Sequence, residues 1–310
     1  MPYSDRMQRN HLYSVFFAPR GRNRIFDLGI QIAQMYLSPF DKIIGIVGEA
    51  GSGKSALIKG MFPGLELTND DDGVNIRPLP LLELDRQSGF FSPHTYHVDI
   101  RFELAFSQPH ELATAIREAI SRQRRVIVEH FDLIYPFLGM NAQLLIGVGE
   151  EILITRPNIF GPEPKEIRRI VFESLPYRLM AHTAEDLCEF YLPPKDMARC
   201  QHSDIKHGFV LTFDEHTPDV DLFELEQKVL AAIAADYSVS YQDEEHIAIN
   251  GTPHACTGPR THVPHTGMIE HFRLLHKFLY NPLDKQYLLV GRVGESSDEK
   301  MSQFNDLDLK

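Results

Sequence analysis

The stretch IIGIVGEAGSGKS, residues 43–55, decides the fold of the first half of the chain. It begins with Ile43–Val47, a short apolar run rich in β-branched side chains, as is typical of a buried parallel strand. Gly48–Ser55 then fits the pattern G-x-x-x-x-G-K-[ST], and residues 55–61 continue as an expected helix. A strand, a glycine-rich turn and a helix in this order are the context in which that pattern binds phosphate groups.

The glycine-rich turn therefore predicts a site for the phosphates of a nucleoside triphosphate, ATP or GTP. Glycines let the backbone fold around an anion, and the helix that follows adds its positive N-terminal end. We expect Lys54 to reach the β- and γ-phosphates and the hydroxyl of Ser55 to ligate Mg²⁺. The predicted nucleotide-binding residues are Gly48, Glu49, Ala50, Gly51, Ser52, Gly53, Lys54 and Ser55.

A magnesium ion in such a site also needs an acidic residue at the end of a neighbouring strand. The run Val126–Val128 is an expected strand, and Glu129 follows it directly, so Glu129 joins Lys54 as the second predicted catalytic residue. Asp99 and Asp85 are alternatives for this role, whereas residues 70–72 form an acidic run that is more typical of a solvated turn.

Further elements surround this motif. Helices are expected at residues 24–37 and 111–122, strands at 11–17, 144–148 and 151–154, and additional strands at 79–84 and 97–102. Strands that alternate with helices predict an α/β domain with a doubly wound, mostly parallel sheet.

The glycine-rich motif near the start of the domain and the segment Val126–Glu129 after a helix resemble small-molecule kinases of the uridine kinase family. This resemblance implies an ATP-dependent phosphotransferase with a small-molecule acceptor that the residues do not identify. Arg156 is a candidate phosphate clamp, although an isolated Arg in a linker is more often solvated.

A cluster of helix-breaking residues marks a linker at residues 156–166. We therefore predict a nucleotide-binding domain at residues 1–160, a second domain at 161–295 and a flexible tail at 296–310. The second domain has helical patterns at residues 169–192 and 221–235 and strand patterns at 209–213, 238–241, 272–275 and 287–290. These patterns predict an α+β fold.

Two parts of this second domain carry metal-ligating side chains. His182 and Asp186 lie one turn apart on the expected helix, on the same face. Cys256 and His262 lie in a downstream loop. Together the four residues can form a tetrahedral zinc site. His254 and His265 flank the loop as possible substitutes, while Cys188 and Cys200 lack ligand spacing.

These segments resemble the second additional domain of threonyl- and alanyl-tRNA synthetases and of their free-standing editing relatives. The resemblance rests on HTAEDL at residues 182–187, on IKHGFVLTF at 205–213, which is similar to the strand after that helix, and on residues 256–275. It implies that His182, Asp186, Cys256 and His262 bind zinc and border a pocket that hydrolyses mischarged aminoacyl-tRNA.

Two departures from the family pattern concern this zinc site. Asp186 stands where the family has a second His, and Arg260 and Thr261 are extra residues between the Cys and the His. Asp can ligate zinc, whereas the insertion shifts His262 unless the loop bulges. The two predicted domains also leave no room for a class-II synthetase core, so aminoacylation is not expected.

The composition limits the number of domains, the classes of partner and the cellular location. The 310 residues suit about two domains. A net charge of −12 disfavours generic nucleic-acid binding, because phosphate contacts rely on Lys and Arg. Three scattered cysteines indicate a reducing compartment, and no apolar run is long enough for a spanning helix or a signal peptide. We expect a soluble, cytoplasmic protein without a membrane partner.

The leading functional prediction is an ATP-binding phosphotransferase that uses Mg²⁺ and carries an editing-like module. One alternative is a zinc-dependent hydrolase that deacylates mischarged tRNA, with tRNA as its partner. The other is a non-catalytic, nucleotide-dependent binding protein.

Overall fold

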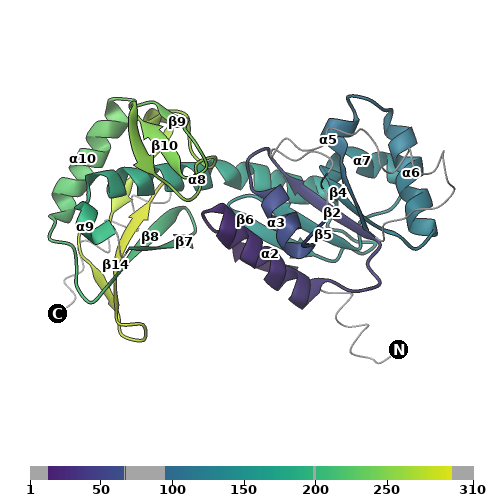
Figure 1. Cartoon of the computed structure of the whole chain (residues 1–310), viewed down its shortest axis with the longest axis horizontal. Coiled ribbons are helices and arrows are strands. Elements are labelled where there is room, and N and C mark those ends of the chain that lie inside the picture. Colours follow the sequence, from purple (N-terminus) through teal and green to yellow (C-terminus); the bar gives the residue numbers. More distant parts are fainter. Residues whose placement is uncertain (1–12, 66, 68–94, 198–199, 295–310) are drawn as a thin grey trace. The chain divides into compact units, whose positions relative to one another are not determined.

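The computed structural model describes residues 13–65, 67, 95–197 and 200–294. The predictions for Asp85, for the acidic run at 70–72, for a strand at 79–84 and for the tail at 296–310 lie outside these residues. Contacts group the chain into two compact units (Figure 1). The first takes in residues up to 16 and 23–173, and the second takes in 17–22 and the chain from 174 onward.

The division between the units falls within helix α8, which spans Pro164–Tyr191. The sequence placed the domain boundary at residue 160, in the proline-rich segment before this helix. The first turns of α8 nevertheless contribute Ile167 and Val171 to the hydrophobic core of the first unit. A linker rich in proline and glycine therefore ends before the first unit does.

The first unit is built on a six-stranded, mostly parallel sheet with the order β1-β6-β5-β2-β4-β3. Strand β2 pairs in parallel with β4 and β5, and β3 pairs in parallel with β4, whereas β6 runs antiparallel to β5. The predicted α/β fold is thus confirmed. The strands are β1 (Tyr13–Phe17), β2 (Ile43–Gly48), β3 (Thr95–Asp99), β4 (Arg125–Glu129), β5 (Leu144–Val148) and β6 (Glu151–Thr155).

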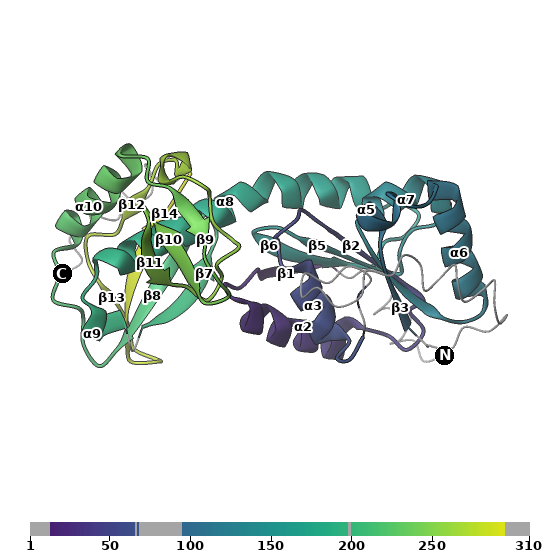
Figure 2. The same cartoon turned by 45° about the horizontal axis from the view of Figure 1, so that its top comes forward.

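Helices cover this sheet on both sides. In Figure 2, α2 and α3 lie along one side of it. On the other side, α6 and α7 share one hydrophobic cluster with side chains of β2–β5. All residues of β2 are buried because paired strands flank it and helices cover it. The helices are α2 (Arg22–Tyr36), α3 (Lys54–Met61), α5 (Ile100–Glu103), α6 (Pro109–Ser121) and α7 (Phe131–Leu138).

The predicted strand at residues 97–102 is wrong in its second half. Strand β3 ends at Asp99, whose side chain accepts a hydrogen bond from the backbone amide of Phe102 at 3.1 Å. An Asp at this position satisfies a free amide at the start of a helix, so the chain turns into α5 instead of extending the strand.

The second unit joins helices to antiparallel sheets, and the predicted α+β fold is confirmed. Three strands form one sheet in the order β11-β10-β9, and a second sheet has the order β12-β14-β8-β7 with β13 paired to β14. Its helices, besides α8, are α9 (Pro194–Met197) and α10 (Leu222–Ala234). Its strands are β7 (Gln201–Ile205), β8 (Gly208–Asp214), β9 (Val239–Tyr241), β10 (His246–Ile249), β11 (Thr252–Ala255), β12 (Arg273–Leu274), β13 (Leu279–Asn281) and β14 (Gln286–Arg292).

The segment at residues 205–213, which the resemblance compared with a single strand, is instead part of a hairpin. Strand β7 ends at Ile205 and β8 begins at Gly208. His207 between them takes a positive φ of 55°, and its ring stacks on Tyr177 with the ring centroids 3.8 Å apart. Over the part of the chain that the structure describes, every helix is too short or too polar to cross a membrane.

Candidate functional site

The glycine-rich loop joins the buried end of β2 to the start of α3. Gly51 and Gly53 both have positive φ, 77° and 95°, and Gly53 caps the N-terminus of α3. A Cβ atom at position 53 would lie 2.7 Å from Cδ1 of Ile25 on α2. The backbone conformation therefore favours glycine at this position, and a larger residue would also displace the side chain of Ile25.

Lys54 and Glu129 meet beside this loop. The register pairs Ile46 of β2 with Glu129 of β4, so both strands end on the same edge of the sheet. The Nζ of Lys54 lies 3.6 Å from Oε1 of Glu129 and donates a hydrogen bond of 2.8 Å to the carbonyl of Glu49. Both charged side chains are buried. The structure thus brings together the two residues that the sequence named as catalytic.

A third buried residue, His97 on β3, joins this pair and was not predicted. Its Nε2 lies 3.1 Å from Oε2 of Glu129. Burial alone would raise the pKa of Glu129, but the hydrogen bond from His97 and the charge of Lys54 outweigh burial, so the pKa is lowered. The position of β3 next to β4 decides this contact, and a strand order could not be read from residue types.

The other acidic and basic candidates have different surroundings. Asp99 caps α5, which makes it a structural residue in this conformation. Arg101 follows two residues later, is half exposed, and donates to Oε1 of Glu49 in the loop at 3.1 Å. Arg101 was not predicted either, because a helix was not expected to begin there.

Arg156 is neither a phosphate clamp nor solvated in this structure. Its guanidinium is buried and donates two hydrogen bonds, of 2.7 and 2.8 Å, to the carboxylate of Asp41. It also donates to the carbonyl oxygens of Tyr36 and Gln143. Arg156 directly follows β6, so these hydrogen bonds join the end of β6 to the end of α2 and to the start of β2.

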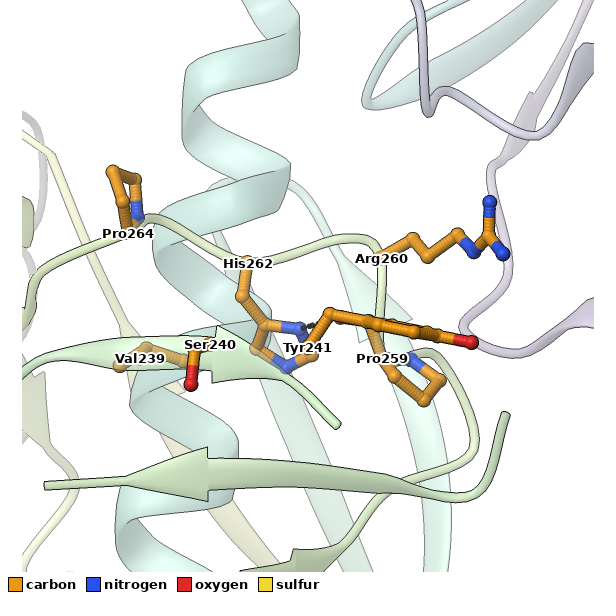
Figure 3. A pocket seen from close by; sticks show the side chains of 7 residues that line it. All are labelled: Val239, Ser240, Tyr241, Pro259, Arg260, His262 and Pro264. Carbon is orange, nitrogen blue, oxygen red and sulfur yellow. Dashed lines mark hydrogen bonds between the residues drawn. The ribbon is translucent and has the colours of Figure 1, made fainter. Parts of the chain in front are cut away.

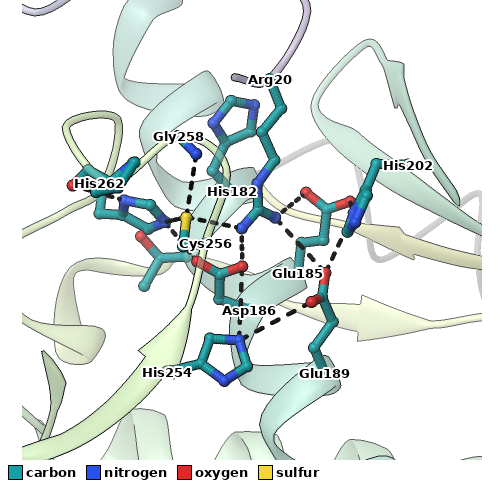
Figure 4. Close-up of polar contacts among 12 residues, drawn as sticks. Arg20, His182, Glu185, Asp186, Glu189, His202, His254, Cys256, Gly258 and His262 are labelled. Atoms are coloured by element: carbon teal, nitrogen blue, oxygen red, sulfur yellow. Dashed lines mark hydrogen bonds and ion pairs between the residues drawn. The ribbon is translucent and has the colours of Figure 1, made fainter. Parts of the chain in front are cut away.

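In the second unit, three of the four predicted zinc ligands come together (Figure 4). The Nε2 of His262 lies 2.7 Å from Oδ2 of Asp186 and 3.8 Å from Sγ of Cys256. Burial, followed by the charge of Arg20, lowers the pKa of His262 to about 3, so its imidazole is neutral at physiological pH.

His182, the fourth predicted ligand, does not join this group. Its Nδ1 lies 3.0 Å from the hydroxyl of Thr261, and its Nε2 lies 3.4 Å from Oδ1 of Asp204. Thr261 is one of the two residues that lengthen the spacing between Cys256 and His262. With this insertion, His262 still lies close to Asp186, whereas the imidazole of His182 contacts Thr261 and Asp204.

His254 lies at the edge of the group. Its Nε2 is 3.9 Å from Oδ1 of Asp186 and 3.9 Å from Oε2 of Glu189. It was named only as a possible substitute, because its place on β11 beside α8 depends on tertiary structure. His265, the other substitute, is exposed.

Arg20 occupies the middle of this group. Its Nη2 donates to Asp186 and, at 3.1 Å, to Sγ of Cys256. Its Nη1 donates to Glu185 at 2.6 Å and lies 3.7 Å from Glu189. The guanidinium of Arg20 thus contacts two of the predicted ligands, and the imidazole of His182 contacts Thr261 instead of the group. The four-residue zinc set therefore does not fit this structure.

We call Arg20 and the six residues around its guanidinium the Arg20 cluster. They are Arg20, Glu185, Asp186, Glu189, His254, Cys256 and His262. Cys188 and Cys200 are not part of it, in line with their spacing. Burial raises the pKa of Cys188 well above its usual value and that of Cys200 to about 12, so both remain thiols.

The chain matches no protein-family model and no curated protein. The function of the chain is therefore inferred from the geometry of the two units. The resemblances to kinases and to synthetase editing domains stay predictions.

A pocket of about 470 Å³ opens next to the Arg20 cluster. His262 lies between the two, since it lines the pocket and contacts Asp186 (Figure 3). Arg260, the other inserted residue, lies over the ring of Tyr241 with 4.9 Å between its Cζ and the ring centroid. The lining residues are Val239, Ser240, Tyr241, Pro259, Arg260, His262 and Pro264.

Proposed function

We propose that the first unit binds a nucleoside triphosphate and transfers its γ-phosphoryl group to a small-molecule acceptor. The observation that carries this proposal is the contact between Lys54 and Glu129 beside the glycine-rich loop. A buried lysine at the start of α3 and a buried acid at the end of β4, the parallel neighbour of β2, suit a site where phosphate and metal meet.

The loop and its basic neighbours form the part that binds the triphosphate. Gly51 and Gly53 take conformations that let backbone amides face an anion, and the N-terminus of α3 adds a positive partial charge. Lys54 supplies a full positive charge, and in the bound state it exchanges the carbonyl of Glu49 for phosphate oxygens. Arg101, already in contact with Glu49, is placed to add a second charge.

The acidic part of the site fits Mg²⁺. The carboxylate of Glu129, with a lowered pKa, is ionised at neutral pH, and Ser55 is the second residue of α3. These two residues would hold the ion or its water ligands, and the ion would neutralise charge on the β- and γ-phosphates. His97 keeps one carboxylate oxygen of Glu129 engaged, while the other faces Lys54.

Direct binding tests the first half of this proposal. Calorimetry with ATP and with GTP, each with Mg²⁺, should show binding to the wild-type chain. Lys54→Ala should lose most of it, because the lysine contact to the phosphates disappears. Lys59→Ala, on the same helix and two residues before its end, is the matched control and should bind normally. Equal binding by both variants contradicts the proposal.

Turnover tests the second half. A phosphotransferase releases nucleoside diphosphate in proportion to a phosphorylated acceptor, and nucleosides are the first acceptors to supply. Diphosphate release with free phosphate instead indicates an NTPase. Binding without turnover favours the nucleotide-dependent binding protein.

The zinc-dependent editing hydrolase has weaker support in the second unit. Its predicted ligand set lacks His182 and contacts Arg20 instead. Release of amino acid from mischarged tRNA, lost in His262→Ala, would nevertheless establish it.

A further inference from the structure

The Arg20 cluster has the ligand types of a metal site but a guanidinium at its centre. The Sγ of Cys256 and the Nε2 of His262 lie 3.8 Å apart. Two ligands of one tetrahedral zinc are separated by about 3.6 Å, given Zn–S near 2.3 Å and Zn–N near 2.1 Å. The sulfur and the imidazole nitrogen are thus spaced as they would be around an ion. Nε2 of His262 and Oδ2 of Asp186, 2.7 Å apart, are instead at hydrogen-bond distance and would have to separate to about 3.4 Å to share one ion.

Arg20 makes the contacts that such an ion would make. The same nitrogen, Nη2, donates to both Asp186 and Cys256, which are two of the predicted ligands. The other terminal nitrogen reaches Glu185. A planar cation with several donors can therefore satisfy a carboxylate and a sulfur that would otherwise be buried without a positive charge.

The path of the chain holds Arg20 in this position. Arg178 on α8 donates a hydrogen bond of 3.2 Å to the carbonyl of Pro19, directly before Arg20. From the other side, the amide of Gly258 donates to Sγ of Cys256 at 3.3 Å. Arg20 is also among the largest fully buried side chains of the protein. Its place is therefore part of the packing of the second unit.

Arg20 and a divalent ion exclude each other here. Both would contact Asp186 and Cys256, and like charges a few ångströms apart in a buried site repel strongly. Glu189 and His254 lie at the edge of the same space. Oε1 of Glu189 lies 3.2 Å from Nδ1 of His202, whereas Nε2 of His254 has no hydrogen-bond partner among the described residues. His254 is therefore available as a further ligand for an ion that replaces the guanidinium.

We propose that Arg20 is a tethered substitute for a metal ion, so that the second unit folds without metal. Removal of the guanidinium converts the cluster into a thiolate-containing site for a divalent transition metal. Asp186, Cys256 and His262 are its ligands, and His254 is the nearest fourth. This inference concerns the second unit and is independent of nucleotide binding in the first.

Metal analysis of the wild-type chain is the first test. The full chain, produced in zinc-supplemented medium, should contain no stoichiometric zinc after gel filtration. Its unfolding temperature should be the same with and without a chelator. Stoichiometric zinc, or destabilisation by the chelator, overturns the proposal whatever any variant does.

Gain of metal by a variant is the second test. Arg20→Ala should bind stoichiometric Co²⁺ and show a thiolate-to-cobalt charge-transfer band, whereas the wild type shows neither. The band should vanish in Arg20→Ala with Cys256→Ser. Arg22→Ala, which removes a half-exposed arginine two residues away, is the matched control and should remain without cobalt.

Each outcome for the variant decides the question. If Arg20→Ala unfolds without metal and folds when Zn²⁺ or Co²⁺ is added, the proposal is supported. If it folds and binds no metal, the guanidinium does not take the place of an ion and the proposal is overturned. If it folds under neither condition, Arg20→Gln replaces it, because the amide keeps polar atoms in the cluster and removes the charge. Cobalt binding by Arg20→Gln supports the proposal, and a folded Arg20→Gln protein without cobalt overturns it.

Discussion

The Nζ of Lys54 lies 3.6 Å from Oε1 of Glu129, beside the carboxyl ends of the parallel strands β2 and β4. The two side chains lie 75 positions apart in the sequence, yet parallel pairing puts the strand ends side by side. His97 on the next strand completes a row of Lys, Glu and His along this edge of the sheet.

Glu129→Gln should retain nucleotide and lose turnover. The amide keeps the size of the side chain and removes a negative charge near the phosphates, so affinity should stay equal or rise. The rate of phosphoryl transfer should fall by about 100-fold or more, since an acid that holds the metal is lost. Calorimetry and a coupled diphosphate assay measure the two effects, and turnover at the wild-type rate excludes Glu129 from the chemistry.

Gly53→Ala should impair nucleotide binding for a steric reason. The new methyl group would meet Ile25 at 2.7 Å, and the residue keeps a φ of 95°. Gly64→Ala is the control, because its φ is 84° but nothing lies within 4 Å of the added atom. The left-handed conformation alone costs about 1–2 kcal/mol in either variant. Only Gly53→Ala should lose affinity in nucleotide titrations, and equal affinities would show that contact with Ile25 is unimportant.

Arg156→Ala should destabilise the first unit and spare nucleotide affinity. Removal of one partner leaves the Asp41 carboxylate buried without its charge partner, which costs about 3–5 kcal/mol. Arg169→Ala breaks an exposed pair with Glu173 and should cost less than about 1 kcal/mol. Urea denaturation measures both. A folded Arg156→Ala protein that no longer binds nucleotide would restore Arg156 as a phosphate ligand.

The second unit should lose stability as pH falls from about 6.5 to about 4. Burial, ahead of the charges of Arg178 and Arg20, lowers the pKa of His182 to about 4, and Asp204 opposes this only in part. In this window the unfolded chain binds a proton that the folded chain does not, so acid favours unfolding, by on the order of 3 kcal/mol for this group.

Denaturation curves at pH 7 and pH 4.5 measure this loss. His182→Gln should reduce the difference between the two curves, because it removes the buried imidazole. His216→Gln, at an exposed position, should leave the difference unchanged. An unaltered difference in His182→Gln would mean that other groups cause the acid sensitivity.

Residue types and spacing were enough to predict most elements of the first unit, but neither α5 nor α7 was expected. The apolar run of β2 and the periodicity of α6 are local signals, and both elements lie where they were expected. The strand expected at 97–102 is too long because Asp99 ends β3 and caps α5. A capping Asp is also a local signal, so the sequence contains the information for the end of this strand.

The sequence did not predict which residues pair with the buried charges. Arg156 stood in a linker, and nothing near it indicated Asp41. Arg20 lies 165 residues before Glu185, in a segment that was predicted to belong to the first domain. Such pairings depend on which elements pack together, and no local pattern encodes that choice.

The sequence by itself determined the glycine-rich loop, the acid after its neighbouring strand and three metal-ligating side chains that do come together. Strand, turn and helix signals are local, and a short motif carries its own backbone requirements. Only the tertiary structure decided that His97 contacts Glu129, that Thr261 contacts His182 and that Arg20 contacts two of the predicted zinc ligands. A buried charge must find a partner, and only the packed chain shows which partner is within reach.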